Sequence, residues 1–165
     1  MIRPARTDDL SHILRCIREL ARYEKLEHEL DLDEQRLHVH LFGEQPIVKA
    51  LIAEDLDERV GFALFYTSYS TFKMRPCLYL EDLVVLPEHR GKGHGLRLLA
   101  AVAAEAEAMG CARLTWNVLD WNESAIRFYR SQGADLMSDW RSCHLTGEGL
   151  SKLAEFGRSG KGTTS

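Results

Sequence analysis

Residues 78–95 of this 165-residue chain read LYLEDLVVLPEHRGKGHG, a buried-strand pattern followed by a glycine-rich turn. The first nine residues are apolar except for the acid pair Glu81 and Asp82, a composition typical of a strand. The turn RGKGHG at residues 90–95 leads into an alanine-rich segment with helical periodicity. Glycine backbone lets a ligand approach closely, and a helix N-terminus carries partial positive charge. The stretch therefore predicts a phosphate or pyrophosphate site.

The glycine turn differs from two common nucleotide-binding loops. A P-loop needs Lys followed by Ser or Thr at the helix start, whereas Gly95 is followed by Leu96 and Arg97. A dinucleotide site needs G-x-G-x-x-G directly after the strand, but residues 87–90 intervene and the spacing is G-x-G-x-G. At this point a surface turn without a ligand remains the alternative.

Composition narrows the class of protein. A net charge of −4 argues against a nucleic-acid partner, and no apolar run approaches the length of ~20 residues that spans a membrane. Residues 1–6 lack the apolar stretch of a secretion signal, and the four dispersed cysteines form no C-x-x-C pair. We expect a cytoplasmic protein with reduced thiols. One domain over residues 1–156 and a disordered tail at 157–165 are expected.

Hydrophobic periodicity predicts alternating strands and helices. The expected strands cover residues 2–5, 48–54, 60–69, 78–86, 113–119 and 140–145. The expected helices cover residues 7–23, 33–41, 91–109 and 122–132, with a last helical turn at 150–156. Strands in antiparallel succession, followed by strands joined through helices, imply an α/β fold with a mixed sheet and helices on both faces.

The acid pair is the first candidate for chemistry. Adjacent residues of a regular strand point to opposite faces, and a carboxylate is costly to bury, so at least one acid should border a cavity or water. An exposed sheet edge or pairing with Arg is the alternative. A carboxylate among apolar neighbours can have a raised pKa and accept a proton near neutrality. Glu81 is the candidate base.

A second candidate lies in residues 118–129, VLDWNESAIRFY. Asn122 is a helix cap, and Tyr129 follows it by about two helical turns. The Tyr129 hydroxyl can donate a proton to a developing thiolate. The alternative is a tyrosine that packs in the core and bonds to the backbone.

These motifs together resemble one enzyme family. The glycine turn resembles the coenzyme A pyrophosphate loop of the GNAT N-acetyltransferases. Residues 121–134, with the acid strand at 79–82, resemble the spermidine/spermine N-acetyltransferase branch, and residues 23–26 and 118–122 are similar to its thialysine acetyltransferase relatives. The resemblance covers about residues 1–156. It implies a GNAT fold, with a splay between the two central parallel strands, and acetyl-CoA as donor, with no metal.

The resemblance also assigns residues. Tyr129 and Glu81 would be the catalytic acid and base. Tyr23, Glu24, Glu81, Asp82 and Trp140 would line the amine site. The coenzyme would contact Leu83, Val84, Val85, Arg90, Gly91, Lys92, Gly93, His94, Gly95, Leu96, Asn122, Glu123, Ser124, Ala125 and Tyr129.

The implied reaction is direct attack of a primary amine on acetyl-CoA in a ternary complex. The acceptor would be a small cationic metabolite, either a diamine or polyamine or a thialysine- or lysine-like amino acid. Six acids within residues 24–34 would attract a cation, or form a solvated face. Lys73 and Arg75 would either disfavour a polycation or favour an acceptor that carries a carboxylate. A protein Lys or N-terminal acetyltransferase and a non-catalytic acyl-CoA-binding module are the alternatives, and the resemblance implies a homodimer.

Overall fold

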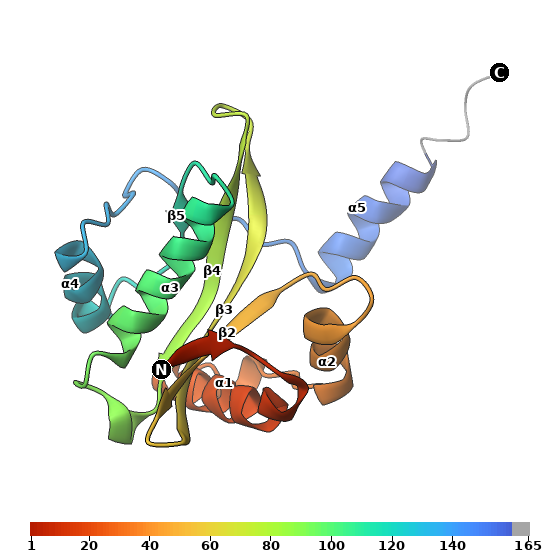
Figure 1. Ribbon diagram of the computed structural model, residues 1–165. Helices are drawn as coiled ribbons and strands as arrows, with labels where there is room; N and C mark the ends of the chain where they lie inside the picture. The colour runs from red at the N-terminus through yellow and green to blue at the C-terminus, as the bar shows by residue number, and fades with distance from the viewer. Residues whose placement is uncertain (160–165) are drawn as a thin grey trace. The chain divides into compact units, whose positions relative to one another are not determined.

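The computed structural model describes residues 1–159, which its contacts divide into two compact units, residues 1–117 and the residues from Val118 onward. The first unit contains the sheet (Figure 1). Within residues 1–159, no helix is long and apolar enough to cross a membrane.

The sheet has five strands in the order β1-β2-β3-β4-β5. Their bounds are Ile2–Pro4, Lys49–Asp55, Glu58–Ser70, Arg75–Val85 and Leu114–Thr115. The first three pairings are antiparallel, and β4 pairs with β5 in parallel. The predicted mixed sheet is confirmed. The predicted strand at 113–119 was too long, since only Leu114 and Thr115 form a ladder before the chain leaves the sheet.

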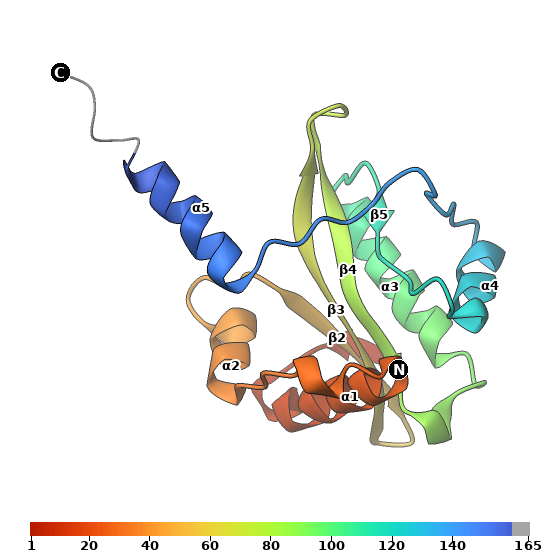
Figure 2. The ribbon, with the colours of Figure 1, turned by 180° about the vertical axis from the view of Figure 1, so that it is seen from behind.

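Helices cover both faces of this sheet. Their bounds are α1 Leu10–Glu24, α2 Glu34–Phe42 and α3 His94–Ala108, with short 3-10 turns η1 Thr7–Asp9, η2 Glu27–Glu29 and η3 Pro87–His89. Figures 1 and 2 show α1 and α2 on one face and α3 on the other. We call these the α1 face and the α3 face.

The amphipathic pattern of each helix explains this layering. On the α1 face, Ile13 and Cys16 pack against Ile52 and Phe62, all fully buried. On the α3 face, α3 buries its apolar stripe, Leu98, Leu99, Val102 and Ala106. The helix begins later than predicted, because Gly91 and Gly93 have left-handed φ angles of 75° and 79°.

The second unit contains α4, Glu123–Ser131, and α5, Gly147–Ser159. Asn122 caps α4 as predicted, since its side chain accepts a hydrogen bond from the Ala125 N–H at 3.2 Å. The predicted strand at 140–145 is wrong, because this segment is irregular and forms no ladder with any described strand. Of the tail expected at 157–165, residues 157–159 belong to α5, and residues 160–165 lie outside the described residues.

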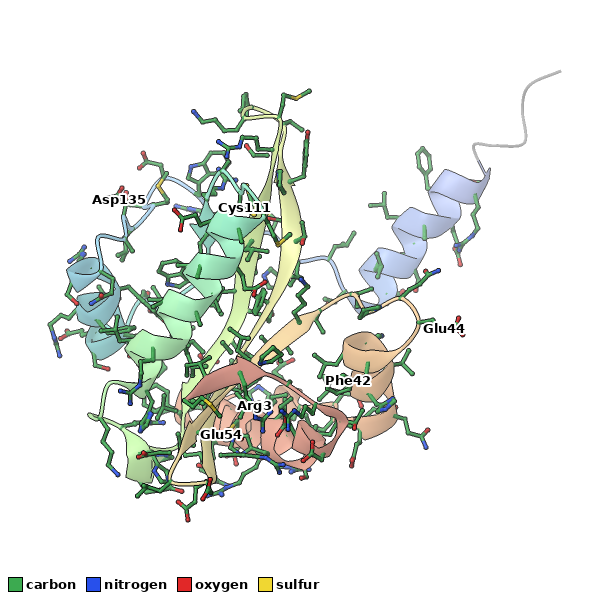
Figure 3. All side chains as sticks on the ribbon, in the orientation of Figure 1. Arg3, Phe42, Glu44, Glu54, Cys111 and Asp135 are labelled. Carbon is green, nitrogen blue, oxygen red and sulfur yellow. The ribbon has the colours of Figure 1, made fainter. Side chains whose placement is uncertain are left out.

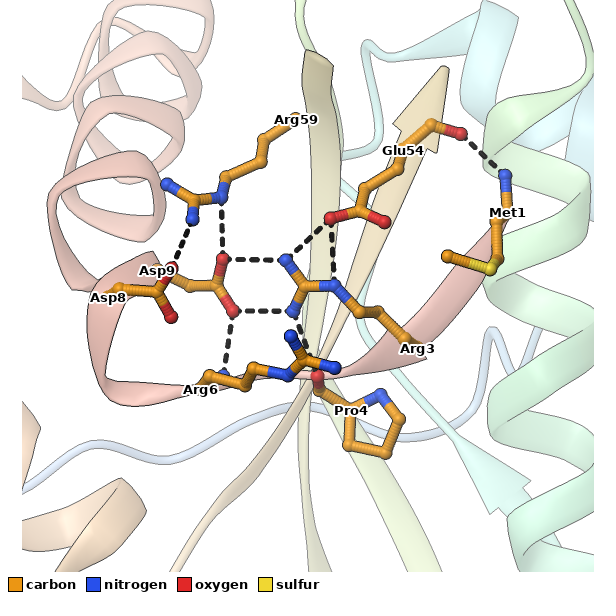
Figure 4. A network of polar contacts seen from close by, with 8 residues as sticks. All are labelled: Met1, Arg3, Pro4, Arg6, Asp8, Asp9, Glu54 and Arg59. Atoms are coloured by element: carbon orange, nitrogen blue, oxygen red, sulfur yellow. Dashed lines mark hydrogen bonds and ion pairs between the residues drawn. The ribbon is translucent and has the colours of Figure 1, made fainter. Parts of the chain in front are cut away.

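A network of ion pairs around the buried Asp9 holds the N-terminal strand β1 in the sheet (Figures 3 and 4). Asp9 is fully buried and receives two hydrogen bonds from the Arg3 guanidinium, at 2.7 and 2.9 Å. Arg59 approaches the same carboxylate at 2.7 Å, and Arg3 also bonds to Glu54 at 2.8 Å. The network joins β1, β2 and β3 to the start of α1. Asp9 therefore acts as an anchor, and its side chain makes no capping bond to α1.

The network determines how Asp9 ionises. Burial alone would raise the pKa of Asp9, but the hydrogen bonds from Arg3 and from the Arg6 N–H, with the charges of Arg3 and Arg59, lower it overall. A carboxyl whose pKa is lower in the folded state adds stability above its unfolded pKa, and this stability is lost as pH falls through the folded value.

We predict that Asp9→Asn lowers the free energy of unfolding by about 3 kcal/mol at pH 7, because it leaves two arginines around an uncharged group. Urea denaturation measures this loss. It should shrink as pH falls below about 4, because the unfolded wild-type chain then binds a proton that the folded carboxyl binds only at lower pH. Asp8→Asn is the matched control, because Asp8 is exposed and pairs with Arg59 alone, so its loss should stay below about 1 kcal/mol. Equal losses for the two variants would contradict the anchoring role.

Candidate functional site

The acid pair lies at an irregularity in β4. Leu64 of β3 pairs with Asp82, but the next residue, Phe65, pairs with Leu80. Glu81 is therefore an extra residue in β4, a β-bulge. Such a bulge shifts the alternation of side chains along the strand.

The shift brings Tyr79 to the same face as Asp82. Leu64 belongs to the core of the α1 face, and Tyr66, two residues further along β3, lies on the same face. Their β4 partners, Asp82 and Tyr79, therefore share that face although they are three residues apart. The expectation that neighbouring acids point to opposite faces of a regular strand does not apply here.

The two acids differ in environment. Glu81 is exposed, whereas Asp82 is partly buried. Burial, followed by the charges of Glu81 and Glu24, raises the pKa of Asp82 from its ordinary 3.8 to about 7. The raised pKa expected for a carboxylate in this strand therefore belongs to Asp82.

Two tyrosines and the end of α1 complete the acidic region. The rings of Tyr66 and Tyr79 stack with centroids 5.2 Å apart, and burial and then the charge of Glu81 raise the pKa of both hydroxyls. Burial also raises the pKa of Glu24. We call Glu24, Glu81 and Asp82 the carboxylate cluster. It favours a cation, because an ammonium group would offset the repulsion among the three acids.

The other acids of residues 24–34 form a solvated face. They are exposed, and Asp31 and Asp33 both pair with Arg36 at 3.1 Å. Glu27 lies 3.5 Å from Arg22. Only Glu24 of this segment acts on the acid pair.

The glycine turn has the features of a phosphate cradle. A Cβ atom added at Gly91 or Gly93 would meet nothing within 4 Å, so their left-handed backbone, not crowding, requires glycine. A Cβ at Gly95 would lie 3.8 Å from a Val85 methyl group, so the first turn of α3 packs against β4. The N-cap residue, Gly93, has no side chain that could bond to the first N–H groups of α3. These N–H groups are therefore available to an anion.

Arg90 connects the glycine turn to the carboxylate cluster. Its Nε donates to the Val85 carbonyl at 3.0 Å, and its guanidinium lies 5.3 Å from the centre of the Tyr23 ring. Tyr23 precedes Glu24 at the end of α1. The predicted donor loop and part of the predicted amine site thus meet through one side chain.

The remaining β4 residues lie beside an opening in the sheet. β5 pairs with β4 only at Leu78 and Tyr79, whereas β4 continues to Val85. Leu83, Val84 and Val85 therefore lie on the part of β4 without a β5 partner. This is the splay expected between the two parallel strands.

The second unit holds the other predicted residues. Ser124 donates to the Asn122 side chain at 3.1 Å, and Glu123 pairs with Arg127 at 3.2 Å. The ring of Tyr129 lies 5.2 Å from that of Phe128 on α4. Trp140 is exposed in the irregular segment.

Two other features lie away from the cluster. Lys73 and Arg75 belong to the tip of the β3–β4 hairpin, and Arg75 lies seven residues from Asp82, which is about 20 Å along a strand. A cavity of about 800 Å³ in the first unit is lined by Ser11, His12, Arg15, Glu54, Asp57, Glu58, Arg59, Leu86, Glu88 and His89, none of them a predicted site residue. Among residues 1–159, no group of three or more His, Cys, Asp or Glu could hold a metal ion.

This combination of sheet, glycine turn and acidic strand agrees with known proteins. Residues 8–134 match the model of the Acetyltransferase (GNAT) family. The chain therefore belongs to the GNAT family of acetyltransferases.

Individual relatives extend over most of the chain. Thialysine N-epsilon-acetyltransferase of Bos taurus is 41% identical over 165 residues, covering 93% of this chain and 96% of that protein. Spermidine/spermine N(1)-acetyltransferase-like protein 1 of Homo sapiens is 34% identical, covering 87% of this chain and 22% of that protein. The structure of an integron cassette protein from V. cholerae has a TM-score of 0.76 at 32% identity, covering 94% of this chain and 97% of that one. The family and the fold predicted from sequence are confirmed.

We predict that Asp82→Asn stabilises the protein at pH 8 by about 3 kcal/mol, because the raised pKa makes ionisation in the folded state costly. The cost is absent below the unfolded pKa and grows as pH rises to about 7, so the variant and the wild type should differ little at pH 4. Thermal unfolding at both pH values tests this, with Asp57→Asn in the exposed β2–β3 turn as control. A destabilised Asp82→Asn at pH 8 would show that the ionised carboxylate stabilises the fold.

Proposed function

We propose that this protein is an N-acetyltransferase that transfers the acetyl group of acetyl-CoA to a primary amine of a small cationic metabolite. The observation that carries the proposal is the carboxylate cluster, which Arg90 links to the glycine turn. The relatives named for thialysine and spermidine/spermine acetylation support a small amine over a protein acceptor or a non-catalytic module.

The glycine turn and the first turn of α3 fit the pyrophosphate of the donor. Two glycines adopt left-handed φ angles there, and the space around them is open. Residues 90–96 would supply N–H groups to the phosphates. The edge of β4 at residues 83–85 that has no β5 partner would bond to the amide groups of the pantetheine arm. Residues 122–125 on α4 would contact the rest of the coenzyme.

The carboxylate cluster would prepare the acceptor. An aliphatic amine has a pKa near ~10, so it is protonated at neutral pH and cannot attack a thioester. We propose that Glu81 removes the proton directly or through a water molecule. Asp82 has a pKa of about 7 and lies next in the chain, so it would share that proton. Tyr23 and Glu24 would line the same amine site.

The remaining steps involve the second unit. The free amine attacks the acetyl carbonyl, and backbone N–H groups of β4 would stabilise the negative charge that develops on its oxygen. We propose that Tyr129 donates a proton to the departing thiolate and that Trp140 contacts the far end of the acceptor. The transfer needs no covalent enzyme intermediate.

The acceptor class depends on charge. Three carboxylates gather at the amine site, which favours an acceptor with more than one positive charge or a long cationic arm. Lys73 and Arg75 lie at the hairpin tip, far along β4 from Asp82. In a single copy of the chain they therefore do not support binding of an acceptor carboxylate next to Asp82. Both diamines and lysine-like amino acids therefore remain in the proposed class.

Release of free coenzyme A thiol tests the function directly. The full chain is incubated with acetyl-CoA and, separately, with spermidine, diamines, thialysine, lysine and peptides with a free N-terminus. Turnover with small amines exceeding turnover with peptides supports the proposal. Bound acetyl-CoA without turnover of any amine would instead indicate a binding module.

We predict that Glu81→Gln lowers kcat at pH 7 by about 100-fold, because the amine loses its proton acceptor. The defect should diminish towards pH 10, where the free amine becomes abundant without a base. Glu88→Gln is the control, because Glu88 is also exposed but pairs with Arg15 near the glycine turn. A defect of equal size at every pH would assign Glu81 to binding instead.

We predict that Tyr129→Phe lowers kcat by at least about tenfold and leaves KM for acetyl-CoA nearly unchanged, since the ring is kept and only the proton donor is lost. Steady-state kinetics with saturating amine measures both constants. Tyr69→Phe, at an exposed position of β3, is the control. A wild-type kcat in Tyr129→Phe would remove Tyr129 from the mechanism.

We also propose a homodimer in the cytoplasm. α5 exposes Leu150, Leu153 and Phe156, which lie at helical spacing and form an apolar stripe suited to a second copy. The four cysteines are free, which supports a reducing compartment. Light scattering of the full chain measures the mass of the assembly.

A further inference from the structure

A series of polar contacts connects the glycine turn to the end of β2. Arg97, on the second turn of α3, donates through Nη2 to the Lys92 carbonyl at 3.1 Å. The same Nη2 lies 3.0 Å from Nδ1 of His94. On the other side of the ring, His94 Nε2 lies 3.4 Å from Oδ2 of Asp55, at the end of β2. The contacts therefore connect the backbone of the turn to the sheet.

His94 is an unusual residue for the first turn of a helix packed on a sheet. Its side chain is only 2% exposed. A guanidinium only donates hydrogen bonds, so Nδ1 accepts from Arg97 and the ring proton of the neutral tautomer lies on Nε2, facing Asp55. Nε2 has no partner with hydrogen-bond geometry among residues 1–159, and the Asp55 carboxylate faces it as a polar contact at 3.4 Å.

The bond to Lys92 determines the direction of the next N–H group. A trans peptide is planar, and its C=O and N–H bonds point in opposite directions. Because the Lys92 carbonyl is turned towards Arg97, the Gly93 N–H points away from Arg97. The left-handed φ of Gly93 allows this peptide orientation beside the start of α3.

We propose that Arg97 and His94, anchored by Asp55, are positioning residues that hold the Lys92–Gly93 peptide with its N–H towards the donor phosphates. This inference rests on the proposed function, since it assumes that the turn binds the coenzyme pyrophosphate. Arg97 acts through its two simultaneous bonds, and His94 acts by fixing the Arg97 side chain. Neither residue needs to touch the acetyl group or the amine.

Two simpler interpretations predict different results. If Arg97 attracts the phosphates only by its positive charge, Lys would replace it. If His94 only fills space in the core, Leu would replace it, because the two side chains have similar volume. In the positioning model, neither substitution restores the orientation of the peptide.

The experiment compares His94→Leu, Arg97→Met and Arg97→Lys with the wild type in the full chain. Calorimetry measures the Kd of coenzyme A, and steady-state kinetics compares acetyl-CoA with S-acetylpantetheine, which has the thioester arm but no phosphate. Arg36→Met is the matched control, because Arg36 is an exposed, ion-paired arginine on α2. Thermal unfolding shows that each variant is folded.

We expect the Kd of coenzyme A to rise about tenfold in all three variants, the effect of losing one charge-assisted hydrogen bond. In the three variants kcat/KM should fall less with S-acetylpantetheine than with acetyl-CoA, and Arg36→Met should match the wild type in every measurement. Full affinity in His94→Leu or in Arg97→Lys overturns the positioning role, as does an equal loss with S-acetylpantetheine. A wild type that binds coenzyme A without turnover would refute the proposed function alone, because the Kd comparison does not depend on catalysis.

Discussion

The extra residue in β4 is the constraint on which the site depends. Without the bulge at Glu81, strict alternation from Asp82 would turn Tyr79 towards the α3 face. With it, Asp82 shares a face with Tyr79 and comes under the influence of Glu24 at the end of α1. The extra residue thus places the stacked tyrosines beside Asp82, whose own carboxyl lies near the charges of Glu81 and Glu24. The cost of that arrangement is visible in the raised pKa of Asp82.

In the first unit, negative and positive groups lie at different places along β4 and the turn that follows it. The carboxylate cluster lies on one part of the strand, and the glycine turn with the positive end of α3 follows its last residue. Arg90 is the contact between these regions, through Val85 and Tyr23. A cationic acceptor and an anionic donor would therefore be drawn to neighbouring places by opposite fields.

Local sequence patterns predicted most of the helices and strands. The features that they did not predict depend on which residues pair across long distances in the sequence. Helix α2, Glu34–Phe42, lies within one residue of the predicted range 33–41, and α3 ends at Ala108, close to its predicted end at residue 109 and before the left-handed Gly110. The bulge could not be predicted, since nothing in the run LYLEDLVV shows that β3 skips Glu81. The segment 140–145 has the composition of a strand, but it pairs with no described strand and is therefore irregular. The link from His94 to Asp55 joins residues 39 positions apart, so no local motif announced it.

The β3–β4 hairpin extends past its neighbours in the sheet. β2 pairs with β3 only as far as Phe65, and β5 pairs with β4 only at Leu78 and Tyr79. Within residues 1–117 the outermost part of the hairpin, residues 68–70 with 75–77, is therefore a two-stranded ribbon. It exposes Tyr69, Phe72 and Met74 near the tip. Such an edge is a template for strands of other molecules, and charged residues or proline oppose that pairing. Lys73 and Arg75 place positive charge beside this exposed edge, a feature that opposes pairing with strands of other molecules.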